Sequence, residues 1–161
     1  MLRDKNLIPL SRQHQHALAL CVRIERASPI AEAELSVWQT EMVQHFRAEI
    51  RVHFEAEERI VFPAAREFKE LNALVEDLVS DHAWLREQFA CAETGDIDGD
   101  EIADFARRLS AHIRKEERQL FERLQDVMSA ERLAKVGARV EEALKEAAQT
   151  CVVPAKDSAA I

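Results

Sequence analysis

A ten-residue pattern, His-x-x-x-Glu-Glu-Arg-x-x-Phe, occurs twice in the chain, at residues 53–62 and 112–121. In each copy the histidine and the first glutamate are four residues apart, so an α-helix carries both on the same face. Apolar residues continue this face before the second copy, where Ile102, Phe105 and Leu109 follow one another at helical spacing. The repeat therefore predicts two helices of a bundle, each turning an imidazole and a carboxylate toward the interior.

The composition predicts an all-α fold. The 161 residues include only three glycines and four prolines and are rich in strong helix formers. We expect an antiparallel up-down-up-down four-helix bundle over residues 1–128, an additional C-terminal helix over residues 129–149, and a flexible tail over residues 150–161. The expected helix boundaries are a cap at Ser11, a break near Ser28-Pro29, an end or kink at Pro63, a helix from about Lys69 to Glu93, a cap at Asp98 or Asp100, an end at Met128 and a start at Ser129.

The net charge of −8 argues against sequence-independent nucleic-acid binding and against docking on anionic membranes. There is no secretory leader pattern and no apolar run long enough to span a bilayer, and the three cysteines are scattered. These features predict a cytoplasmic protein with reduced thiols. The acidic stretch DIDGD at residues 96–100 has its glycine at the wrong position for a calcium-binding EF-hand loop, so we interpret it as a helix-capping turn.

Four histidines are expected at one height in the bundle. Two residues on neighbouring antiparallel helices lie level when the turn falls midway between them. The midpoints of the successive histidine pairs are residue 97, in the acidic loop, residues 67–68, just past Pro63, and residues 33–34, a little past the break at Ser28-Pro29. The histidines in question are His14, His53, His82 and His112. His16 lies on a different helix face from the apolar stripe, so we prefer His14.

A buried layer of four histidines and two glutamates, Glu57 and Glu116, would cost several kcal/mol unless its charges were neutralised. Arginine or lysine could neutralise the carboxylates but would give the imidazole nitrogens no reason to converge. Two metal ions satisfy all six groups. Imidazole and carboxylate without thiolate suit iron, manganese or zinc, and six ligands are too many for one tetrahedral zinc ion.

The stretches LSRQHQHAL, FRAEIRVHFEAEERIVFP, DHAWLRE and HIRKEERQLF together resemble the hemerythrin HHE cation-binding domain, over residues 10 to about 125. The resemblance implies a four-helix bundle that holds a non-haem di-iron centre. Its cofactor would be two iron ions (Fe2+/Fe3+), bridged by carboxylates and an oxo or hydroxo group. The implied metal ligands are His14, His53, Glu57, His82, His112 and Glu116, with Glu57 and Glu116 as the bridges.

The chain departs from the oxygen-carrying hemerythrins, which have two histidines four apart on the third helix. The positions four residues from His82 are Leu78 and Arg86. Glu49, one turn before His53, or His16 is therefore a possible additional ligand. A centre with fewer histidines favours ferric iron, which makes reversible oxygen transport a poor interpretation.

Three functions remain open at this stage. The first is a module that binds or responds to dioxygen, nitric oxide or the iron and redox status of the cell. The second is an oxidoreductase that acts on peroxide, oxygen or nitric oxide, or an iron donor in cluster repair. The third is a metal-free helical interaction module, in which the C-terminal helix packs on the bundle, on a second copy or on a partner protein.

Overall fold

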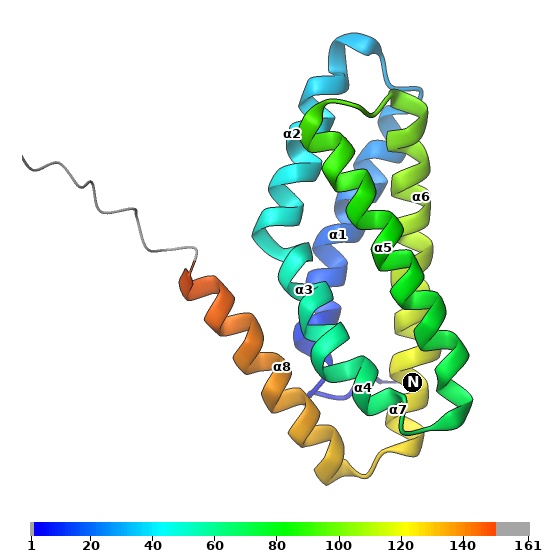
Figure 1. Cartoon of the computed structure of the whole chain (residues 1–161), viewed down its shortest axis with the longest axis vertical. Coiled ribbons are helices and arrows are strands. Elements are labelled where there is room, and N and C mark those ends of the chain that lie inside the picture. Colours follow the sequence, from blue (N-terminus) through cyan, green and yellow to red (C-terminus); the bar gives the residue numbers. More distant parts are fainter. Residues whose placement is uncertain (1, 151–161) are drawn as a thin grey trace, which may run out of the picture.

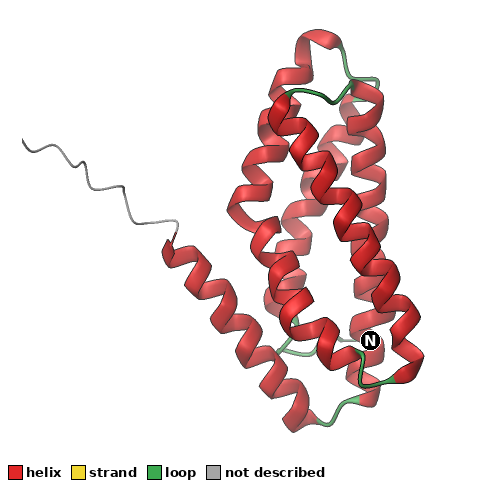
Figure 2. Cartoon of the chain, viewed as in Figure 1, coloured by secondary structure: helices red, strands yellow, loops and turns green. Residues whose placement is uncertain are grey.

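The computed structural model of the chain describes the backbone of residues 2–150 and the side chains of residues 2–146. Within residues 2–150 every regular element is a helix or a helical turn (Figure 2), which confirms the all-α fold class. No helix in this part of the chain has both the length and the apolar character that crossing a bilayer requires.

The first helix, α1, spans Ile8–Ala27 and begins earlier than the sequence suggested. The prediction that Ser11 caps it is wrong. Leu7 is the N-cap and Pro9 lies in the first turn, where its missing N–H is not needed. Buried Leu7 and Leu10 draw this turn onto the core, and the Ser11 hydroxyl instead donates to Glu117 Oε1 at 2.7 Å.

The second bundle helix is continuous but not uniform. It follows a short 3₁₀ turn, η1 (Glu32–Glu34), and passes through α2 (Leu35–His45), the π-turn η2 (Phe46–Ile50), α3 (Arg51–Ala56), a second π-turn η3 (Glu57–Val61) and α4 (Phe62–Ala65). Pro63 does not end the helix, which continues to Ala65. Proline lacks a backbone N–H, so one hydrogen bond of a regular helix is missing at Pro63. The π-turn η3, which ends at Val61, lies just before it, and such a turn is a common site of irregularity in a helix.

The third and fourth helices have the predicted order and nearly the predicted ends. The 3₁₀ turn η4 (Lys69–Leu71) leads into α5 (Asn72–Thr94), which ends at Gly95 with φ +80°. The fourth helix consists of α6 (Gly99–Lys115), the π-turn η5 (Glu116–Leu120) and α7 (Phe121–Val127). Asp98 and Glu101 form a reciprocal capping box at 2.9 Å, which confirms the capping interpretation of the acidic loop.

The four helices run alternately up and down, with α1 beside α6 and α2 beside α5 (Figure 1). Their apolar side chains form two separate clusters. One includes Leu10, Val61 and Leu78, and the other includes Cys21, Phe89 and Phe105. Four buried histidines and two buried glutamates belong to neither cluster and lie between them along the bundle. The core is therefore divided by a polar layer.

The last described helix, α8 (Ala130–Thr150), crosses the second bundle helix obliquely (Figure 1). Its residues Leu133, Val136 and Val140 are buried in the first apolar cluster. Cys21 is buried and Cys91 is partly buried, and both are free thiols, whereas Cys151 lies outside the described residues. The predicted tail, residues 150–161, also lies outside them apart from Thr150.

Candidate metal centre

Six side chains from all four bundle helices meet in the polar layer. Each is between 0% and 5% exposed. They form two groups of four, each with two histidines and both glutamates, and the ligand atoms of each group lie within 4.8 Å of one another. The first group is His14, His53, Glu57 and Glu116, and the second is Glu57, His82, His112 and Glu116. The structure thus brings together all six residues that the sequence singled out, and Glu57 and Glu116 are common to both groups.

The histidines of each group face one another through their inner nitrogens. His14 Nε2 lies 2.9 Å from His53 Nε2, and His82 Nε2 lies 3.1 Å from His112 Nε2. Glu116 spans the two groups, since Oε2 lies 3.1 Å from His14 Nε2 and Oε1 lies 3.2 Å from His112 Nε2. Glu116 therefore contacts a histidine of each group, with one oxygen for each.

Glu57 also spans the two groups, but a single oxygen lies near a histidine of each group. Its Oε2 lies 3.3 Å from His53 Nε2 and 3.5 Å from His82 Nε2. Although these distances are those of ion pairs, none of the four oxygens of Glu57 and Glu116 has a hydrogen-bond partner in the described part of the chain. Buried carboxylates without partners are strongly unfavourable. They indicate a site built for a positively charged ligand.

The outer nitrogen of each histidine has its own acceptor. The Nδ1 atoms of His14, His53, His82 and His112 lie 2.7, 2.9, 2.8 and 3.2 Å from oxygens of Glu117, Gln13, Glu58 and Asp81, respectively. An Nδ1–H that donates outward leaves the lone pair on Nε2, directed into the cluster. In the neutral rings, each group then has two converging nitrogen lone pairs and two carboxylates. This donor set fits a divalent or trivalent cation in each group.

The second glutamate of each repeat orients a histidine from a different helix. Glu58 accepts from His82, and Glu117 accepts from His14. This role of the second glutamate was not predicted, although its presence in both copies of the repeat was a signal. It also missed Gln13 and Asp81, which adjoin a ligand in sequence but carry no repeated pattern.

The final phenylalanine of each repeat packs on the same histidine that the second glutamate orients. Phe62 lies 5.4 Å from the ring of His82, and Phe121 lies 5.6 Å from that of His14. The two copies are thus related by an approximate twofold arrangement around the cluster. Of the fixed residues of the repeat, the histidine and the first glutamate belong to the cluster, and the second glutamate and the phenylalanine contact one of its histidines. The arginine is exposed.

A π-turn begins at each of the shared glutamates, at Glu57 in η3 and at Glu116 in η5. The turn is one residue wider than an α-helical turn, and such turns occur frequently at functional sites. The spacing within the repeat does not reveal these turns, because a regular α-helix would also place the histidine and glutamate on one face.

Two of the histidines favour the protonated form strongly in the absence of metal. Burial opposes a charge on His14, but the carboxylates of Glu116 and Glu117 outweigh it and raise its pKa to about 9. Burial also opposes a charge on His112, yet the charge of Glu116 and the contact with Asp81 raise its pKa to about 10. Protons therefore neutralise part of the cluster's negative charge in the metal-free protein.

The carboxylates are held in their ionised form. Burial opposes ionisation of Glu116, but His112 and His14 hold its pKa well below the usual value. Burial and the charge of Glu116 oppose ionisation of Glu57, whose pKa is nevertheless lowered by His53 and His82. Both shared glutamates are thus ready to bind cations at neutral pH.

Glu49 and His16, the two possible additional ligands, lie outside both groups. They pair with each other at the surface, with His16 Nδ1 2.9 Å from Glu49 Oε2, and the side chain of His16 is 61% exposed. His14 and His16 are two residues apart, which turns them to nearly opposite faces of α1. The structure places His14 in the first group and His16 outside both groups.

A small cavity adjoins the first group of ligands. It has a volume of about 10 Å³, and its lining includes His14, His53, Glu116, Gln13 and Phe54. A cavity needs roughly 10–15 Å³ open to the centre of a water molecule to hold one water. Only a molecule of about that size fits beside the site without movement of the chain.

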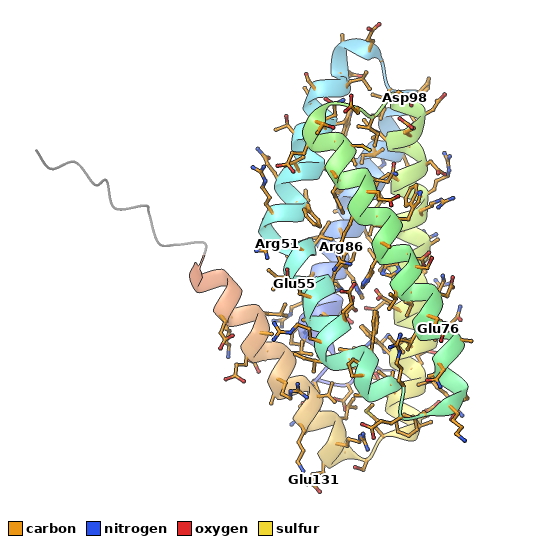
Figure 3. The ribbon with its side chains drawn as sticks, in the orientation of Figure 1. Arg51, Glu55, Glu76, Arg86, Asp98 and Glu131 are labelled. Carbon is orange, nitrogen blue, oxygen red and sulfur yellow. The ribbon has the colours of Figure 1, made fainter. Side chains whose placement is uncertain are left out.

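Cationic side chains hold three of the outer acceptors. Arg86 lies between α3 and α5 (Figure 3) and donates to Glu58 at 2.7 Å. Lys115 donates to Asp81 at 2.8 Å, and Arg3 donates to Glu117 at 2.6 Å. Gln13, the acceptor of His53, is neutral, so the two groups of ligands have different electrostatic surroundings.

Comparison with known families agrees with this architecture. The family model described as Hemerythrin HHE cation binding domain matches residues 9–124, which is most of the chain and includes all six residues of the cluster. No curated protein and no solved structure matches the chain. Because this match covers more than half of the chain, the chain belongs to the hemerythrin HHE cation-binding domain family.

Proposed function

We propose that the chain binds two iron ions in the buried cluster and uses them to bind or respond to dioxygen, nitric oxide or redox status. The observation that carries the proposal is the pair of ligand groups that share Glu57 and Glu116, whose four oxygens have no hydrogen-bond partner in the described part of the chain. His14, His53, His82 and His112 would supply the nitrogen ligands.

The donor set favours iron over a structural zinc ion. Each group offers two imidazole nitrogens and two carboxylates, and neither group includes a cysteine. Structural zinc sites are closed and four-coordinate, whereas iron takes imidazole and carboxylate ligands in higher coordination numbers. With four protein ligands for each ion, the higher coordination number of iron would leave a position for a small ligand.

Iron at this site would supply a change between the ferrous and ferric states and an exchangeable coordination position. The protein's own contribution is orientation and exclusion of water. The outer acceptors hold the rings of the four histidines, and Phe54 stacks on His82 at 3.8 Å and closes that side of the site. The shared glutamates keep negative charge at the centre, which favours ferric iron over ferrous iron.

The small cavity is space that the structure offers beside the centre. It lies against His14 and His53 and holds about one molecule the size of water. Dioxygen, nitric oxide and peroxide are of nearly this size, whereas an organic substrate would require movement of the helices. This supports a response to a small inorganic molecule.

The test is metal analysis with optical spectroscopy. Protein loaded anaerobically with ferrous iron should retain about two irons per chain, as the two groups of ligands predict. Exposure to air or nitric oxide should then produce new absorption bands, and Glu57→Ala should abolish them. Retention of only a trace of iron by the folded protein would refute the proposal. Repeated turnover of added peroxide would assign the same centre to an oxidoreductase instead.

A further inference from the structure

The N-terminal segment reaches the metal centre although it lies outside the part of the chain that the family model matches. Arg3 Nη2 donates to both the backbone oxygen and the Oε2 atom of Glu117, at 2.6 Å each. Arg3 Nη1 donates to Gln125 Oε1 at 3.1 Å. One guanidinium therefore holds the side chain and the backbone of Glu117, within the π-turn that begins at Glu116.

Arg3 contacts both side chains that hold the ring of His14. Glu117 accepts from His14 Nδ1, and the ring of Phe121 stacks on that of His14. The guanidinium carbon of Arg3 lies 5.2 Å from the centre of the Phe121 ring. From these contacts we infer that Arg3 is a positioning residue of the metal centre, and that α8 determines where Arg3 lies.

The segment that carries Arg3 is fastened to α7. The backbone N–H of Asp4 donates to Gln125 Oε1 at 3.0 Å, and Gln125 Nε2 donates to the backbone oxygen of Leu2 at 3.1 Å. Asn6 folds back on Asp4, with its backbone N–H 2.9 Å from Asp4 Oδ1. These bonds make residues 2–6 a short strap across the end of the bundle.

Helix α8 presses on this strap at a glycine. A Cβ atom at Gly137 would lie 2.5 Å from the Cβ of Asn6 and 2.9 Å from its Cα and backbone oxygen. Because two of these three atoms are backbone, a side chain at position 137 would force the strap and α8 apart. A series of contacts thus joins α8 to His14: Gly137 meets Asn6, Asn6 bonds Asp4, Asp4 and Arg3 share Gln125, and Arg3 holds Glu117.

The group of His82 and His112 is not held through Arg3, although α8 also packs on η3, which carries Glu57 and Glu58. In that group, the acceptor that corresponds to Glu117 is Glu58. Glu58 is held by Arg86, which belongs to the bundle helix α5 (Figure 3). Loss of the contacts of Arg3 should therefore weaken the group of His14 and His53 more than the group of His82 and His112. This inference depends on the proposed metal binding, but it assigns a role to parts of the chain that the proposal does not use.

The first test replaces Arg3 in the full-length protein. Arg3→Met keeps an apolar side chain over Phe121 but removes the donors to Glu117. We expect the affinity for one of the two ferrous ions, titrated anaerobically, to fall about tenfold, the lower end of the effect of losing a metal ligand's own partner, because Glu117 itself stays in place. The ferric absorption bands should shift, and Arg3→Lys, which restores the charge, should recover part of the loss. Arg47→Ala, which breaks an exposed pair with Glu93 away from the centre, is the control and should leave binding unchanged.

The second test leaves the centre untouched. Gly137→Ala should lower the affinity for the same ion and shift the bands in the same direction, although alanine is the better helix former. Ala138→Ser, at the adjacent exposed position, is the matched control and should have no effect.

The outcomes of the two tests can be told apart. Wild-type affinity and spectra in folded Arg3→Met would overturn the inference, and a loss in Arg3→Met without one in Gly137→Ala would overturn the role of α8. Failure of the wild-type protein to bind iron would instead refute the proposed function.

Discussion

Metal binding should become stronger as the pH rises, because two ligand histidines carry protons in the metal-free protein. The pKa of His14 is raised to about 9 and that of His112 to about 10, in both cases by carboxylates that outweigh the effect of burial. One of these residues belongs to each group of ligands. At pH 7 each metal ion must therefore displace at least one proton.

The size of the effect follows from the number of protons displaced. One displaced proton changes a binding constant about tenfold per pH unit, or about 1.4 kcal/mol, so the overall constant for two ions should rise about 100-fold per unit between roughly pH 7 and pH 8.5. Glu57 and Glu116 add nothing to this slope, because their pKa values are lowered and both are already ionised.

The assay is anaerobic calorimetry with ferrous iron in buffers of different ionisation enthalpy. The heats should report the release of two or more protons per chain at pH 7. Asp81→Asn removes one of the groups that raise the pKa of His112 and should reduce the dependence on pH. Release of less than one proton, or an affinity that stays constant between pH 7 and 8.5, would refute the reasoning.

The same pKa shifts have the opposite effect on the stability of the metal-free fold. A histidine whose pKa is raised by folding stabilises the fold fully below its unfolded pKa of about 6.5, and this stabilisation is lost as the pH rises through the folded value. For His14 and His112 the loss occurs between about pH 6.5 and 10. Thermal unfolding of the metal-free protein should therefore occur at a lower temperature at pH 9.5 than at pH 6.5. An unchanged or higher unfolding temperature at pH 9.5 would contradict these assignments.

Four substitutions test the roles of individual residues by metal analysis. Glu116→Gln should weaken the binding of both ions, because Glu116 belongs to both groups. His53→Ala should reduce the stoichiometry from about two to about one, because His53 belongs to one group. Equal losses in the two variants would show that the groups are not separate. Glu58→Gln should lower the affinity about tenfold by removing the charge that faces His82, and an unchanged affinity would show that this charge is unimportant. His16→Ala should leave two irons bound, since His16 is an exposed partner of Glu49, and loss of an iron would contradict the assignment of His14.

The convergence of the six buried residues could be predicted from the sequence because it depends on two robust quantities. Helical periodicity determines which face a residue occupies, and the midpoints between successive histidines determine their relative heights. An error of one or two residues at a helix end changes the height by only about 3 Å. The choice between His14 and His16 was decided in the same way, by the stripe that continues to Leu10 and Cys21.

The outer partners could not be predicted by the same means. The chain has 30 aspartate and glutamate residues, and the pattern does not indicate which of them accept from the buried imidazoles. Glu117 and Asp81 are chosen by the packing of one helix against another. The start of α1 was also missed, because burial of Leu7 placed the helix start before Ser11, the better capping residue by type.

The polar layer separates the two apolar clusters of the bundle. The apolar clusters on either side can each remain packed when the layer between them is disturbed, so loss of the ions would loosen the middle of the molecule before its two ends. Amide hydrogens near His53 and His112 would then exchange with solvent faster than those near Phe89 or Leu124. The stiffness of this layer, rather than any large change in shape, would then distinguish the loaded from the unloaded protein.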